Sequence, residues 1–160
     1  MNGFGYGTLD GNGEVWYKFI NGQSNYPRRP HAITYTGISD SVISGMRYVQ
    51  SQMWTMTVIH AQNVLLEDIY VNSQSPSGAS IINTDGADTI YADNITFRRW
   101  SVTNGDDCLS PKANSTNIMM EDCDFYNGLG IAMGSIGQYD GQFEFIENVT
   151  ARDIRFTNMR

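Results

Sequence analysis

The chain has 160 residues, 41% of them hydrophobic and 17% charged, with ten Lys and Arg against seventeen Asp and Glu. A chain of this length buries one core, so we expect a single domain over residues 1–160. The formal net charge of −7 offers no basic face for nucleic acid, and no apolar run is long enough to cross a bilayer. We therefore expect neither nucleic acid nor a membrane as a partner.

The composition favours strands over helices. Sixteen glycines, together with many Asn, Ser and Thr residues, separate short runs of β-branched and aromatic residues. No stretch keeps a helical period of apolar residues. We therefore predict an all-β protein with many strands joined by turns.

Four segments repeat one pattern, and a weaker copy begins at Ser41. In each, an apolar residue is followed by apolar residues five and seven positions later. The triplets are Val64/Ile69/Val71, Ile90/Ile95/Phe97, Ile118/Cys123/Phe125 and Val149/Ile154/Phe156. A polar residue precedes each middle position and is predicted to form a corner, and these residues are Asp68, Asn94, Asp122 and Asp153.

The first residues of the triplets are 26, 28 and 31 residues apart. Loops that vary in length between constant strand patterns indicate parallel strands stacked coil on coil, with the middle residues in one inward column. A propeller blade or a leucine-rich repeat has a different period, and a β-sandwich remains the alternative. Neither end shows a capping element or a signal peptide. We therefore expect a partial solenoid, without its terminal coils or caps, from a longer chain.

Aspartates recur one coil apart. Asp85 follows Asn83-Thr84. Asp106 comes 21 residues after Asp85, between Gly105 and Asp107. Because neighbouring coils lie about 4.8 Å apart, we expect the three carboxylates in one exposed patch. Mutual repulsion would raise at least one pKa and keep a general acid protonated, as inverting glycoside hydrolysis requires with its carboxyl groups roughly 6.5–9.5 Å apart. An ordinary turn, a solvated loop or a calcium site is the alternative.

The order of the motifs resembles glycoside hydrolase family 28, which contains polygalacturonases and rhamnogalacturonases. Asn83-Thr84-Asp85 is similar to its Asn-Thr-Asp motif, and Gly105-Asp106-Asp107 to its Gly-Asp-Asp motif. Gly128-Leu129-Gly130 and the following residues 131–137 resemble its Gly-His-Gly segment and tail. The stretch Gly7–Gly13 resembles its Gly-x-Ile-Asp-Gly-x-Gly segment, so that the resemblance covers essentially the whole chain.

The resemblance implies a right-handed parallel β-helix and inverting hydrolysis of a pectic polysaccharide, with no cofactor and no metal. It gives Asp106 the role of the general acid, and Asp85 and Asp107 the roles of holding and deprotonating the attacking water. It also implies that Asn83 positions this group, and that Gly130 and Ser135 contact substrate. Lys112 is a further candidate for meeting an acidic sugar, although a solvated lysine fits the sequence equally well.

Two departures from the family pattern bear on specificity. Leu129 stands where polygalacturonases carry a histidine, and no Arg-x-Lys motif precedes Arg160, so we expect that motif downstream. The missing histidine favours an exo-acting galacturonosidase or rhamnosidase over an endo-polygalacturonase, because it resembles the exo-acting and rhamnogalacturonan-directed members of the family. A non-catalytic carbohydrate-binding β-helix and a calcium-dependent pectate lyase remain as alternatives.

Three glycosylation sequons, at Asn94, Asn114 and Asn148, indicate a secreted, extracellular glycoprotein, which we expect to be a monomer. Cys108 and Cys123 permit one disulfide. Cys123 occupies an inward apolar slot, so a buried free thiol is equally compatible with the sequence.

Overall fold

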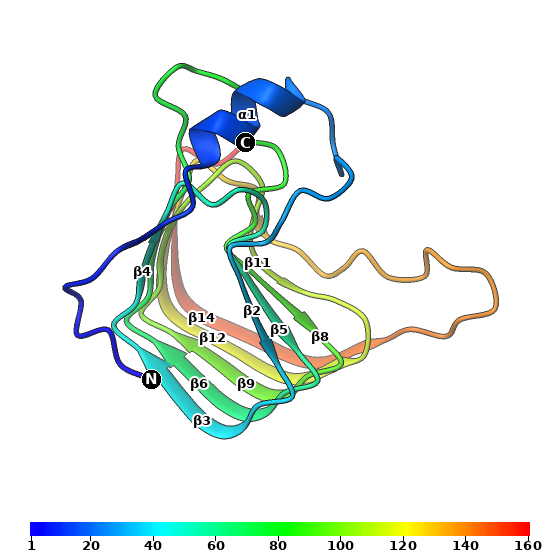
Figure 1. Cartoon of the computed structure of the whole chain (residues 1–160). Coiled ribbons are helices and arrows are strands. Elements are labelled where there is room, and N and C mark those ends of the chain that lie inside the picture. The colour runs from blue at the N-terminus through cyan, green and yellow to red at the C-terminus, as the bar shows by residue number, and fades with distance from the viewer.

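The computed structural model describes all 160 residues as a coil of parallel strands (Figure 1). The larger sheet contains β1 (Leu9–Asp10), β3 (Ser39–Ser44), β4 (Arg47–Val49), β6 (Gln62–Glu67), β7 (Tyr70–Asn72), β9 (Asp93–Arg98), β10 (Ser101–Thr103), β12 (Ser115–Tyr126) and β14 (Ile146–Thr157). The smaller sheet contains β2 (Ile33–Thr36), β5 (Met56–Ile59), β8 (Ala87–Ile90), β11 (Asp107–Pro111) and β13 (Gly130–Ile131).

Each coil runs from a strand of the smaller sheet through two strands, or two halves of one strand, of the larger sheet. The long strand β12 pairs with β9 through its first half and with β10 through its second half, so that the larger sheet bends into two faces. The smaller sheet, in the order β13-β11-β8-β5-β2, forms the third face (Figure 1). All pairs are parallel, which confirms the right-handed parallel β-helix.

The corners of the coil are formed by residues with positive φ. Asn63, Asn94, Asn117 and Asn148 have φ of 54–55° at one corner, a conformation that asparagine tolerates better than other side-chain-bearing residues. Their side chains also connect the coils, because the Nδ2 of Asn94 donates to Asn63 Oδ1 at 2.9 Å and that of Asn148 donates to Asn117 Oδ1. The second corner contains Asp68, Asp122 and Asp153, as the sequence predicted, but the prediction was wrong for Asn94, which lies at the first corner; Arg99, with φ of 53°, takes its place.

The predicted column of Ile69, Ile95, Cys123 and Ile154 is wrong at Ile95. Ile95 pairs with Val64 and with Ile118, and therefore belongs to the neighbouring column. Trp100 precedes Ser101, the partner of Tyr70 and Asp124, and so occupies the slot beside Ile69 and Cys123. The side chain in this slot is therefore aromatic and not the aliphatic one that was expected. Ile90, the first residue of the predicted triplet, belongs to β8 of the other sheet. Equivalent positions on successive coils, such as Asn63, Asn94, Asn117 and Asn148, are 31, 23 and 31 residues apart.

The core fills the interior of the coil as one continuous cluster of 21 buried hydrophobic residues. Inward-facing side chains alternate along each strand, as in the pattern of Ile95 and Phe97 in β9. The indole of Trp100 is 1% exposed and donates through Nε1 to Leu66 O at 2.8 Å, so its polar atom is satisfied inside the core.

The sequence missed one helix, α1 (Gly13–Ile20). It buries Tyr17 and Ile20 on one face, and eight residues are too few to reveal a helical period in the sequence. The phenol of Tyr17 donates to Ser51 O at 2.7 Å, which fixes α1 over the loops at one side of the coil (Figure 1). No helix of the structure is long and apolar enough to cross a bilayer.

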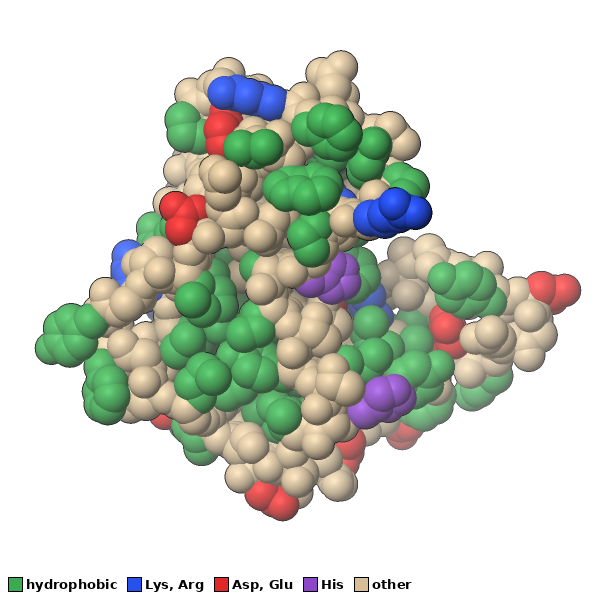
Figure 2. All heavy atoms as spheres, in the orientation of Figure 1, with side chains coloured by type: hydrophobic (Ala, Val, Ile, Leu, Met, Phe, Trp, Pro, Cys, Tyr) green, Lys and Arg blue, Asp and Glu red, His purple; other side chains and the backbone are tan.

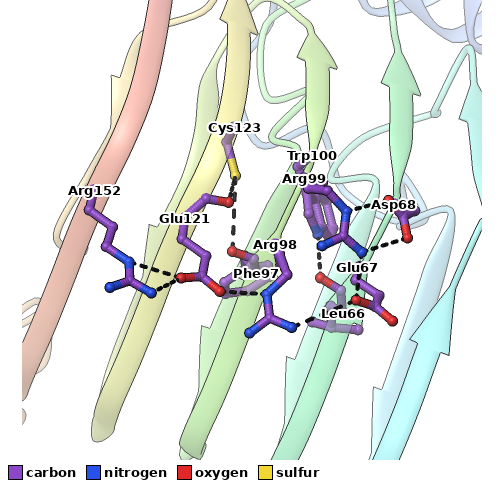
Figure 3. A network of polar contacts seen from close by, with 10 residues as sticks. All are labelled: Leu66, Glu67, Asp68, Phe97, Arg98, Arg99, Trp100, Glu121, Cys123 and Arg152. Carbon is purple, nitrogen blue, oxygen red and sulfur yellow. Dashed lines mark hydrogen bonds and ion pairs between the residues drawn. The ribbon is translucent and has the colours of Figure 1, made fainter.

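A row of ion pairs crosses the outer face of the larger sheet (Figure 3). Glu67, Arg98, Glu121 and Arg152 lie on β6, β9, β12 and β14, and each charge contacts the opposite charge on the next coil. Hydrogen bonds from Arg152 and then Arg98 lower the pKa of Glu121. Solvent screens ion pairs on an outer face, so the row supports the register of the coils more than overall stability.

We expect Ile95→Ala to lower the free energy of unfolding by about 2–5 kcal/mol, because it leaves a cavity between Val64 and Ile118. Thr96→Ala, on the outward side of the same strand, is the matched control and should change stability by about 0.5 kcal/mol or less. Urea unfolding measures both. Equal effects of the two substitutions would contradict the inward orientation of Ile95.

Candidate active site

The three predicted aspartates lie in stacked turns that lead from the larger sheet into the smaller one. Backbone hydrogen bonds align these turns from coil to coil: Thr55 N donates to Asp85 O at 2.7 Å, and Gly86 N donates to Asp107 O at 2.9 Å. Leu129 N continues the ladder by donating to Asp106 O at 2.8 Å. The 21-residue offset between Asp85 and Asp106 is therefore one coil.

The carboxylates converge. One oxygen from each of Asp85, Asp106 and Asp107 lies within 4.8 Å of the other two. This contact is tighter than the expected spacing of roughly 6.5–9.5 Å between an acid and a base. The reason is local: Asp106 Oδ2 accepts a hydrogen bond from Asn83 N at 2.8 Å, which draws its carboxylate toward the coil of Asp85. Asp107 N donates to Asp106 Oδ1 at 3.0 Å and holds the other oxygen.

Burial controls protonation in this cluster. Asp85 is 3% exposed, and desolvation, followed by repulsion from Asp88, Asp106 and Asp107, raises its pKa strongly. Desolvation and then the charge of Asp106 also raise the pKa of Asp107. The cluster therefore retains at least one proton at neutral pH, and Asp85 is the member that burial favours in the neutral form.

Neighbouring motif residues form the scaffold of the turns. The buried Asn104 donates from Nδ2 to Thr84 O at 2.9 Å and to Asp107 O at 2.8 Å, and so joins the two coils. Gly105 N donates to Thr84 Oγ1 at 3.0 Å. A Cβ on Gly105 would come within 2.2 Å of Ile81, so this close approach of the coils requires glycine.

Asn83 acts through its backbone. Its amide N–H holds Asp106, whereas its side-chain oxygen accepts hydrogen bonds from Ser24 Oγ at 3.2 Å and Asn25 N at 3.0 Å. The side chain thus anchors the loop that leads from α1 to β2. Asn83 has φ of 59°, which asparagine adopts readily, and this geometry turns its N–H toward Asp106.

The structure also reveals a buried ion pair that the sequence did not predict. Asp88, three residues after Asp85, has no exposed surface, and its Oδ1 lies 3.0 Å from Lys112 Nζ. Lys112 also donates to Gly134 O at 2.7 Å and Ser110 Oγ at 3.2 Å. Its ammonium therefore already has three partners. Asp88 lies on the side of β8 that pairs with Thr57 and Ser110, so the available signal was an aspartate within a short strand.

Arg29 is a further cation near the carboxylate cluster, and the sequence did not predict it. Arg29 is 5% exposed and donates from Nε to Gln52 O, and its two terminal nitrogens have no hydrogen-bond partner in the chain. Desolvation lowers the pKa of Arg29, and the charges of Tyr17, Asp85 and Asp106 oppose that shift. The carboxylates thus lie between two buried cations.

The remaining predicted site residues do not all gather at the cluster. Gly130 pairs with Asp107 in the ladder between β11 and β13, with φ of 89°, and lies next to the site. Ser135 does not join the three carboxylates but lines a hollow beside Lys112. Three carboxylate oxygens this close could coordinate a divalent cation, but the raised pKa of Asp85 opposes coordination by its charged form.

Both cysteines are free and buried, which is the second of the two states that the sequence allowed. Cys108 lies in β11 of the smaller sheet and Cys123 in β12 of the larger one, and burial raises the pKa of their thiols to about 12 and about 11. At the predicted glycosylation sites, the Nδ2 of Asn94 and of Asn148 donates to an asparagine of the preceding coil, whereas Asn114 uses only its oxygen, which accepts from Phe145 N.

Known proteins resemble this chain over nearly its whole length. The model of glycosyl hydrolases family 28 matches residues 2–160. The α-L-rhamnosidase rgxB of Aspergillus niger is 52% identical over 98% of this chain and 36% of its own length. The exopolygalacturonase of Cochliobolus carbonum is 37% identical over 99% of this chain and 35% of its own length. The chain thus spans about a third of the relatives that it matches.

Among solved structures, the endo-xylogalacturonan hydrolase of Aspergillus tubingensis superposes with a TM-score of 0.87 at 27% identity. The match covers 95% of this chain and 40% of that one. The parallel coil of this chain is therefore also present in an enzyme that acts on a polysaccharide.

The raised pKa values predict how stability depends on pH. Above its usual value near 3.8, an aspartate is ionised in the unfolded chain but stays protonated in the fold, so the folded state loses relative stability as the pH rises. We expect the melting temperature to fall between pH 5 and pH 8, and Asp85→Asn to flatten that slope. Thermal unfolding across this range measures both, with Asp153→Asn as the exposed control. A slope unchanged by Asp85→Asn would contradict the assignment.

Proposed function

Because the chain belongs to glycosyl hydrolases family 28, we propose that its protein hydrolyses α-glycosidic bonds of a pectic polysaccharide. The observation that carries this proposal is the convergence of Asp85, Asp106 and Asp107 from adjacent coils, with oxygens within 4.8 Å. Carboxylates that share a proton supply both an acid and a base, which are the two groups that glycoside hydrolysis needs.

The proposed mechanism is an inverting one. Asp106 donates a proton to the leaving oxygen, and Asp85 and Asp107 hold and deprotonate the attacking water. Asp106 is partly exposed and can reach a substrate, whereas Asp85 is 3% exposed. The burial that protonates Asp85 in the free chain provides the proton that the cluster passes to Asp106 before the leaving oxygen is expelled. Asn83 and Lys112 have positioning roles in this scheme: Asn83 N–H orients Asp106, and Lys112 neutralises Asp88.

We further propose an exo-acting enzyme that removes galacturonosyl or rhamnosyl units. The similarity to a rhamnosidase and to an exopolygalacturonase supports this choice. Leu129 supports it as well, because it is 51% exposed and its backbone N–H contacts Asp106 O, so the position of the family histidine is apolar. The protein would act outside the cell as a monomer, with the pectic polymer as its partner and without a cofactor.

Asp106→Asn should reduce hydrolysis about 10²–10⁴-fold, because the amide keeps the shape of the side chain but cannot donate the proton of a carboxylic acid. The measurement is release of reducing ends from polygalacturonate and from rhamnogalacturonan by the natural protein. Asp153→Asn, at an exposed corner of β14, is the matched control and should retain full activity.

Other outcomes separate the competing functions. Full activity in Asp106→Asn would remove this residue as the acid. An unsaturated, ultraviolet-absorbing product that disappears with a chelator would indicate a calcium-dependent lyase. A natural protein that binds both polymers and cleaves neither would be a carbohydrate-binding β-helix.

Leu129→His tests specificity. The imidazole would lie beside Asp106 and add a hydrogen-bond donor where the present side chain is apolar. We expect relative activity on galacturonosyl substrates to rise severalfold over that on rhamnosyl substrates. The ratio of kcat/KM for the two substrates measures the effect, with Leu129→Met as the apolar control. An equal ratio in all three proteins would show that this position does not select the sugar.

A further inference from the structure

A hollow of about 250 Å³ lies where β8 and β11 end, beneath the loop of residues 132–145. Trp54, Tyr91 and Lys112 line it from the coil, and Tyr139 and Glu144 line it from the loop. The loop projects from the body of the coil (Figure 1), and hydrophobic side chains gather on the loop and on the facing surface (Figure 2). Trp54 precedes Thr55, whose N–H donates to Asp85 O at 2.7 Å, and Lys112 lies 3.0 Å from Asp88, so the hollow borders the carboxylate cluster.

The wall formed by the coil is ordered before any ligand binds. His31 stacks on Trp54 with ring centroids 4.5 Å apart, and the Lys112 ammonium lies 4.9 Å from the Trp54 ring. His60 stacks on Tyr91 at 5.1 Å. Tyr91 and Tyr139 remain 44% and 61% exposed, so each offers an apolar ring with a hydroxyl at its edge.

The charges in the hollow disfavour an acidic sugar. Lys112 is bound to Asp88, Gly134 O and Ser110 Oγ, and moving it to a ligand would leave the fully buried Asp88 without its counter-ion. Glu144 accepts a hydrogen bond from Gly137 N at 2.7 Å and keeps a negative charge on the wall formed by the loop. A ligand carboxylate would therefore meet a repelling charge and no free cation.

The remaining polar groups suit hydroxyls. The side chains of Gln138 and Gln142 line the hollow and make no hydrogen bond within the protein, so both can donate to and accept from a ligand. The volume is below the roughly 300–1,000 Å³ of sites for drug-sized ligands, which fits one sugar ring.

We propose that this hollow is a binding site for one neutral sugar ring, carried by the same pectic polymer that is cleaved at the carboxylate cluster. The inference rests on the proposed function for the identity of the polymer. It goes further by assigning the loop of residues 132–145 the role of selecting polymers with uncharged sugars, at a hollow that borders the catalytic aspartates.

The test is calorimetric binding to the natural protein carrying Asp106→Asn, so that no substrate is consumed. The two ligands are a galacturonate oligomer and a rhamnogalacturonan oligomer of equal length with neutral side-chain sugars. Tyr139→Ala should weaken binding of the second ligand about tenfold, because it removes one aromatic wall, and should leave the first unchanged. Glu144→Gln keeps the acceptor for Gly137 N and should strengthen binding of the galacturonate oligomer severalfold.

Phe143→Ala is the control on the same loop, because Phe143 is 85% exposed and does not line the hollow. Equal weakening of both ligands by Tyr139→Ala, or no effect on either, would overturn the proposal, and so would unchanged galacturonate binding in Glu144→Gln. Hydrolysis by the natural protein is measured separately. Selective binding without hydrolysis would refute the proposed function and leave the neutral-sugar site in place.

Discussion

Backbone hydrogen bonds between successive coils decide where the carboxylates lie. Thr55, Asp85 and Asp107 belong to three successive turns of one ladder, and groups on adjacent turns must face each other at the spacing of parallel strands. The ladder and the core beneath it therefore hold together three acidic side chains that would separate in water. Burial, and then electrostatic repulsion among the carboxylates, therefore raise the pKa values of Asp85 and Asp107.

This arrangement costs stability, and the fold offsets part of that cost with buried cations. Lys112 lies 3.0 Å from Asp88, and Arg29 places a second buried charge near Asp85 and Asp106. Neither cation neutralises the cluster completely, because a fully paired cluster would lose the proton that an acid must carry. Functional sites commonly retain such a conflict between stability and chemistry.

Regular and irregular parts of the coil have different roles. The larger sheet carries repeating contacts on its outer face, the asparagine ladder and the ion pairs of Figure 3, and these keep neighbouring coils in register. The smaller sheet is flanked by two long loops: residues 21–32 contact the turns, and residues 132–145 form one wall of the hollow. Variable loops on a rigid scaffold are where substrate selection usually resides.

The sequence by itself determined the parallel coil, the polar corners at Asp68, Asp122 and Asp153, and the adjacency of Asp85 with Asp106, because each follows from spacing along the chain. Tertiary structure decided what depends on contacts between distant residues. Trp100 occupies the column of Ile69 with its indole N–H bonded to Leu66 O, and α1 is held in place because Tyr17 reaches Ser51. The pairing of Asp88 with Lys112 likewise required the register of β8 with β11, which no local pattern encodes.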